Sequence, residues 1–83
     1  MTREDAIALA GGEDLLFADG LDEAIVGVGC RCGQQDVVVY DKAKVVECFE
    51  AQGMTCEEAW EYAEFNTFGA WVGDQTPIWM STP

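Results

Sequence analysis

Residues 37–53, VVVYDKAKVVECFEAQG, contain the two strongest structural signals in this chain. The run Val37–Tyr40 is entirely apolar and mostly β-branched, which predicts a strand in the centre of a sheet. Asp41 follows it as a helix N-cap, and Gly53 predicts where that helix ends. The apolar residues of the helix recur at the spacing of one buried face: Val45, Val46 and Phe49.

Further strands are expected before and after this segment. Residues 24–31, AIVGVGCR, favour a strand, although Gly27 and Gly29 weaken it and indicate a close approach by another backbone. The connection 33–35 predicts a hairpin to the apolar strand. Residues 76–80, TPIWM, predict a final edge strand, because the proline at its start has no N–H to donate.

Two more helices are expected near the ends of the chain. Thr2 is a suitable N-cap for a short helix that stops at residues 11–12, which are both glycine. The capping box Thr55–Glu58 begins a helix that runs to about Phe68, with Gly69 as its C-terminal signal. Four residues are expected to form the buried stripe of that helix: Ala59, Trp60, Ala63 and Thr67.

These elements predict an α+β fold in which residues 1–83 form one small domain, with three helices packed on a sheet of three or four strands. No stretch of about 18 apolar residues predicts a membrane span. The N-terminal MTRED lacks the basic patch and apolar stretch of a signal peptide, so we expect a cytoplasmic protein.

The charge of the chain is strongly one-sided. Sixteen Asp and Glu face four Lys and Arg, and the net charge is −12. Three Trp, four Phe and two Tyr distinguish this composition from that of an acidic disordered chain. Solubility of a small domain needs a net charge of only about 2–8. The excess suggests that the negative field has a use.

The predicted third helix concentrates this charge. Glu57, Glu61 and Glu64 share one stripe, with Glu58 beside them, and no Lys or Arg follows Lys44. Two residues of the second helix extend the candidate acidic surface: Glu47 and Glu50. One interpretation is a surface that imitates the phosphates of DNA and binds the basic groove of a nucleic-acid-binding protein. The alternatives are a solvated face that serves solubility, or adaptation to high salt.

Catalysis and metal binding have little support in the sequence. The chain has no histidine, the usual general base near neutral pH and the commonest metal ligand. Four cysteines are expected to be buried, reduced thiols, with a zinc site or a redox role as alternatives: Cys30, Cys32, Cys48 and Cys56. The acidic stretch 14–23 lacks the ligand register of a calcium loop and is interpreted as an acidic turn. We expect no enzyme activity, no metal and no cofactor.

The aromatic residues of the C-terminal third are expected to lie mostly in the core: Phe65, Phe68, Trp71 and Trp79. Trp71 lies between Gly69 and Gly73, and its alternative role is that of an exposed anchor at an interface.

The stretch 64–77, EFNTFGAWVGDQTP, resembles a segment of small proteins of tailed bacteriophages and prophages. So do residues 16–20 (LFADG) and 38–41 (VVYD), and Gly53-Met54 followed by 57–59 (EEA). The resemblance implies a phage origin and expression in the cytoplasm of a bacterial host, and it transfers no residue roles.

Small acidic phage proteins often bind a host protein. By that analogy, this chain is expected to be a non-enzymatic inhibitor of a host nucleic-acid-binding or defence complex, similar to an anti-CRISPR protein or a DNA mimic. Its partner would be a basic protein surface, with no direct contact to nucleic acid or membrane. Its candidate binding residues are Glu57, Glu58, Glu61, Glu64, Glu47, Glu50 and Trp71. The alternative is a virion or accessory structural protein joined through its aromatic segment.

Overall fold

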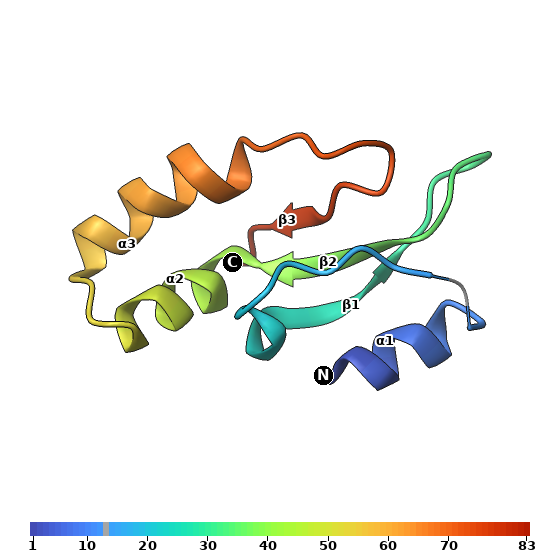
Figure 1. The fold of residues 1–83 in the computed structure, drawn as a ribbon, viewed down its shortest axis with the longest axis horizontal. Helices are drawn as coiled ribbons and strands as arrows, with labels where there is room; N and C mark the ends of the chain where they lie inside the picture. The colour runs from blue at the N-terminus through green and yellow to red at the C-terminus, as the bar shows by residue number, and fades with distance from the viewer. Residues whose placement is uncertain (13) are drawn as a thin grey trace.

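Strand β2 (Val37–Asp41) lies in the centre of a sheet with the strand order β1-β2-β3 (Figure 1). β1 (Ile25–Gly29) pairs with it in the antiparallel direction, and β3 (Ile78–Met80) pairs with it in the parallel direction. The computed structural model describes residues 1–12 and 14–83. Within them the predicted central strand, hairpin and edge strand are confirmed.

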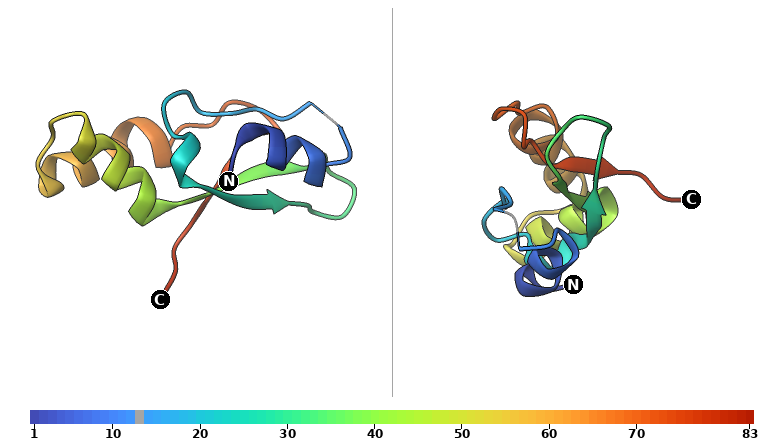
Figure 2. Two further views of the ribbon diagram at one scale, coloured as in Figure 1. Left: turned by 90° about the horizontal axis from the view of Figure 1, so that it is seen from below. Right: turned by 90° about the vertical axis from the view of Figure 1, so that its right-hand side faces the viewer.

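Three α-helices accompany the sheet in the described residues. α1 lies against β1, whereas α2 continues directly from β2 and forms a hairpin with α3 that extends beyond the end of the sheet (Figures 1 and 2). The expected α+β class, with three helices on a small sheet, is confirmed. The bounds of the helices, of the 3₁₀ turn η1 and of the π-helical turn η2 are α1 Arg3–Leu9, η1 Asp22–Ala24, α2 Lys42–Ala51, α3 Cys56–Ala63 and η2 Glu64–Phe68.

The predicted N-caps begin all three helices. The side chain of Thr2 accepts a hydrogen bond from the backbone N–H of Asp5, and that of Asp41 accepts one from the N–H of Ala43 at 2.9 Å. Thr55 forms the predicted capping box at the start of α3. Each cap satisfies backbone donors that have no partner inside the helix.

Tyr40 of β2 is the centre of the core. Its side chain is fully buried, and it pairs with Ile25 of β1 and Trp79 of β3 across the sheet. The Trp79 ring stacks on it at a centroid distance of 5.0 Å, and the Tyr40 hydroxyl accepts a hydrogen bond from the N–H of Ala18 at 2.8 Å. One residue thus joins all three strands to the segment before β1. The other core residues are Ala6, Leu21, Ala24, Ile25, Val38, Val45, Val46, Phe49, Ala59 and Ala63.

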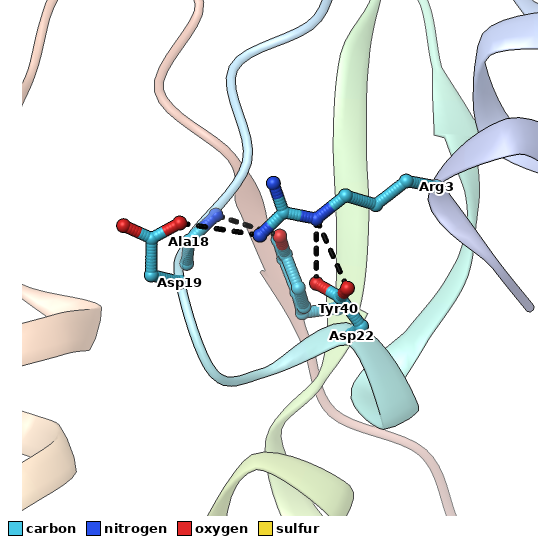
Figure 3. A network of polar contacts seen from close by, with 5 residues as sticks. All are labelled: Arg3, Ala18, Asp19, Asp22 and Tyr40. Atoms are coloured by element: carbon cyan, nitrogen blue, oxygen red, sulfur yellow. Dashed lines mark hydrogen bonds and ion pairs between the residues drawn. The ribbon is translucent and has the colours of Figure 1, made fainter.

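Arg3 fastens the same segment to α1 (Figure 3). Its Nε donates to both carboxylate oxygens of Asp22, at 2.8 and 3.0 Å, and its Nη2 donates to Asp19 at 3.2 Å. The guanidinium also lies 4.9 Å from the centre of the Phe17 ring. Two carboxylates of the predicted acidic turn are therefore paired with an arginine of the same chain at the protein surface.

Several expectations about burial are wrong. Trp60 is 38% exposed, because it lies at the edge of the α3 face that Ala59 and Ala63 bury. Cys30, Cys32 and Cys56 are exposed thiols, since β1 ends before the first two and Cys56 occupies the first turn of α3.

The glycines of β1 were expected to mark a close approach by another backbone, but the structure shows side chains at Gly29 and open space at Gly27. A Cβ on Gly29 would lie 3.2 Å from a methyl group of Val39 and 3.3 Å from one of Ile78, so side chains rather than another backbone crowd this position. Gly27 has open space beside it. It follows an irregularity in the β1–β2 register, where Val26 is the extra residue.

Substituting Tyr40→Phe is expected to destabilise the fold by about 1–2 kcal/mol, because the N–H of Ala18 loses its acceptor in a half-buried position. The free energy of unfolding in urea measures this loss. Tyr62→Phe is the matched control, since Tyr62 is 44% exposed. Equal stability of Tyr40→Phe and the parent would contradict this role of the hydroxyl.

Tyr40 also predicts a pH dependence. Burial raises its pKa above the ordinary value of 10.0, against the opposing effect of the Ala18 N–H. A group whose pKa is raised by folding contributes stability that is complete below its unfolded pKa and is lost as pH rises through the folded pKa. The parent is therefore expected to lose stability above about pH 10 more steeply than Tyr40→Phe does. The measurement is the free energy of unfolding in urea at a series of pH values. If this free energy falls equally with pH in the two proteins, the expectation is wrong.

Candidate protein-binding surface

The acidic stripe of α3, which Glu64 of η2 continues, faces outward. Ala59 and Ala63, four residues apart, are fully buried and define the inner face of the helix. Glu57, Glu61 and Glu64 lie on the opposite side and are exposed. The small side chains of Ala59 and Ala63 allow α3 to lie close to α2. The acidic stripe remains exposed to solvent because it lies on the opposite side of the helix.

These carboxylates are uncompensated in the part of the chain that the structure describes. There, the ion pairs of Arg3 with Asp19 and Asp22 are the only salt bridges, and neither involves a glutamate of α2 or α3. Lys42 and Lys44 lie in the first turn of α2, where the nitrogen of Lys42 is 5.2 Å from the centre of the Phe68 ring. The far end of the α2–α3 hairpin therefore carries only negative charge among these residues.

Glu58 has a structural role in addition to its charge. Its carboxylate accepts a hydrogen bond from the backbone N–H of Thr55 at 3.0 Å, while its own N–H donates to the Thr55 hydroxyl at 3.2 Å. Two hydrogen bonds lower the pKa of Glu58. The larger effect comes from the backbone of Thr55 and the smaller from the Thr55 side chain. Glu57, Glu61 and Glu64 are consequently the residues that test charge without disturbing a cap.

The other predicted binding residues lie elsewhere on the surface. Glu47 and Glu50 are exposed on α2. Glu47 is next to Cys48 in the chain. Burial is the largest cause of the raised pKa of Cys48, and the negative charges of Glu23 and Glu47 raise this pKa further.

Trp71 is 74% exposed, so the expectation that it lies in the core is wrong, and its alternative role as an interface anchor stays a prediction. It lines a hollow of about 340 Å³ with Arg31 and residues of the β1–β2 hairpin. Trp71 therefore belongs to a different surface from the glutamates of α3.

Phe65 is the surface residue that sequence reasoning missed. Its side chain is 86% exposed, although the aromatic segment predicted a core position. It follows Glu61 by four residues and therefore lies one turn further along the same face. The four-residue spacing from Glu61 could have indicated from the sequence that Phe65 lies on the exposed face. Phe65 also belongs to the π-helical turn η2, a type of turn that is often found at functional sites.

A hollow of about 430 Å³ lies beside the Phe65 ring. Exposed carboxylates, aromatic rings and an amide surround it, and its lining holds no cationic side chain. The side-chain amide of Asn66 donates to the carbonyl oxygen of Tyr62 at 3.2 Å, which leaves its own oxygen free to accept. The lining residues are Met54, Glu58, Glu61, Tyr62, Phe65 and Asn66.

A second, more apolar cleft of about 350 Å³ lies between residues 16–21, the end of α3 and the loop before β3. Leu16, Phe17, Val72 and Trp79 contribute to its walls. The indole N–H of Trp79 is buried with no acceptor among the described residues.

Metal ligands do not gather in the described residues: they contain no group of three or more His, Cys, Asp or Glu side chains that would hold an ion. None of the described helices combines the length and the apolar character needed to cross a membrane. Comparisons with protein-family profiles, with curated proteins and with solved structures found no match to this chain.

The pKa of Glu58 predicts an acid-sensitive helix start. Because folding lowers this pKa below its ordinary value of 4.5, the stabilisation is complete above that pH and is lost as pH falls through the lowered value. The stability advantage of the parent over Glu58→Ala should therefore shrink below about pH 4.5. Urea unfolding between pH 7 and pH 3 measures the difference. Glu58→Gln is the control, because its amide oxygen still accepts from Thr55 but does not titrate. An advantage over Glu58→Ala that stays constant over this range contradicts the assignment.

Proposed function

We propose that this protein is a non-enzymatic interaction protein that binds a basic surface of a nucleic-acid-binding protein. In this proposal the chain is phage-encoded, acts in the cytoplasm of the bacterial host and inhibits its partner by occupying the groove that otherwise binds DNA or RNA. The observation that carries the proposal is the exposed, uncompensated carboxylate stripe on α3.

Folding explains only the start of this stripe, where Glu57 and Glu58 lie in the first turn of α3 and suit the helix dipole. Glu57 and Glu61 are four residues apart, a spacing at which like charges destabilise a helix. Glu61 also lies in the C-terminal half of α3, where the helix dipole disfavours negative charge. A surface that opposes folding is consistent with selection for binding, and a cationic partner would remove the repulsion.

The distribution of charge fits an electrostatic encounter. Lys42 and Lys44 lie in the first turn of α2, whereas α3 contributes only acids, so the molecule has a negative end. Carboxylates on a rigid helix present fixed negative charges to a groove whose Lys and Arg side chains normally contact phosphates. Such a field accelerates association and makes binding strongly dependent on salt.

The exposed Trp71 supports a second candidate function, that of a virion or accessory structural protein. Trp71 and Val72 are 74% and 60% exposed and are adjacent in sequence. An interface at this position would be apolar, and the net charge would then serve only solubility. Binding through Trp71 should change little with salt, whereas binding through α3 should weaken steeply.

The triple substitution Glu57→Gln/Glu61→Gln/Glu64→Gln tests the proposed function. Immobilised parent protein is expected to capture nucleic-acid-binding proteins from a bacterial lysate, and duplex DNA should displace them. The triple variant should lose this capture while keeping its fold, because all three side chains are exposed. Mass spectrometry identifies the captured proteins, and circular dichroism checks the fold.

A second triple variant separates position from net charge. Glu4→Gln/Glu23→Gln/Asp74→Asn also removes three exposed carboxylates, all outside α3. It should retain capture. Equal losses in both variants would show a non-specific effect of charge, and unchanged capture by the α3 variant would overturn the proposed function.

A further inference from the structure

We infer that the exposed face of α3 and the following turn η2 recognises arginine side chains of its partner, with a guanidinium stacked on the Phe65 ring and paired with Glu61. This inference rests on the proposed function and names the chemistry of the contact. It starts from Phe65, a large apolar side chain that is 86% exposed on an otherwise charged helix face.

Phe65 has no role in the core that explains its presence. Phe49 and Tyr62 pack edge to face at 5.0 Å, and Trp60 contacts Phe68 at 6.4 Å, so the neighbouring aromatic rings have partners inside the protein. The Phe65 side chain instead remains in water. A solvent-exposed aromatic residue is typical of an anchor that becomes buried when a partner binds.

The hollow beside Phe65 has the chemistry of a cation site. Its polar side-chain groups are the carboxylates of Glu58 and Glu61, the amide of Asn66 and the hydroxyl of Tyr62, and its apolar walls include the Phe65 and Tyr62 rings. The Asn66 amide donates one N–H to Tyr62, so its oxygen, the two carboxylates and the aromatic rings are available to a cationic ligand. A phosphate or carboxylate ligand would be repelled there.

Among protein cations, arginine fits this surface better than lysine. The guanidinium is planar, is weakly hydrated, stacks on aromatic rings and donates two parallel hydrogen bonds to one carboxylate. The ammonium of lysine is a strongly hydrated point charge, which gains less from an aromatic face. The four-residue spacing of Glu61 and Phe65 places a carboxylate and a ring one helical turn apart. One arginine side chain can contact both.

Two peptide probes of equal charge test the inference: deca-arginine and deca-lysine, titrated by calorimetry into the full chain at about 0.15 M salt. The parent is expected to bind the arginine peptide about threefold to fivefold more tightly, which corresponds to one cation–π contact at an exposed site. Phe65→Ala should clearly reduce this ratio while still binding both peptides, and the remaining preference reflects the pairing of arginine with Glu61. Phe65→Leu should do the same, because it keeps an apolar side chain but has no ring.

Trp71→Ala is the matched control, because Trp71 is equally an exposed aromatic residue but lines a different hollow. It should keep the preference for arginine. Glu61→Gln should weaken binding of both peptides and also reduce the ratio.

The outcomes separate the inference from the proposed function. Equal binding of the two peptides by the parent, or an unchanged ratio in Phe65→Ala, would overturn arginine recognition and leave electrostatic binding intact. If the parent binds neither peptide at low salt, the proposed function itself fails.

Discussion

The fold depends on the burial of Tyr40 in the central strand. The ring joins β1 and β3 through its cross-strand neighbours Ile25 and Trp79, and the hydroxyl holds the backbone of Ala18. A small domain has a small hydrophobic core, so one buried residue with many contacts accounts for a large share of the free energy of folding. Arg3 acts on the same segment from the outside, where it binds Asp19 and Asp22. Together the two residues hold residues 17–22 in place before β1.

The acidic surface is a consequence of how α2 and α3 pack. The inner face of α3 is narrow, since Ala59 and Ala63 are its buried residues. A narrow buried stripe leaves the greater part of the helix circumference to water, and this part contains the glutamates and Phe65. The hairpin also extends beyond the sheet, so this surface projects from the molecule (Figure 1). Geometry of this kind lets a partner groove approach α3 without a clash with the sheet.

Charge and aromaticity contribute differently to such a surface. Long-range attraction steers encounters but discriminates poorly between cationic residues. Short-range stacking on a ring and pairing with a carboxylate depend on the shape of the cation. The glutamates and Phe65 therefore combine attraction with selectivity on one helix face, whereas Trp71 offers a separate contact near the β1–β2 hairpin.

The sequence by itself determined the elements and their order. The apolar run at 37–40, the caps at Thr2, Asp41 and Thr55, and the spacing of Val45, Val46 and Phe49 are local signals, and each element that they predict is present. The outward position of the glutamates was also predictable, because charged side chains avoid an apolar core. The tertiary structure decided which aromatic residues and thiols are buried. Trp60, Phe65 and Cys56 have apolar side chains in a helical segment, but the narrow contact between α2 and α3 leaves them exposed. Burial of an apolar residue depends on a neighbour that covers it, and that neighbour is fixed only when the distant parts of the chain meet.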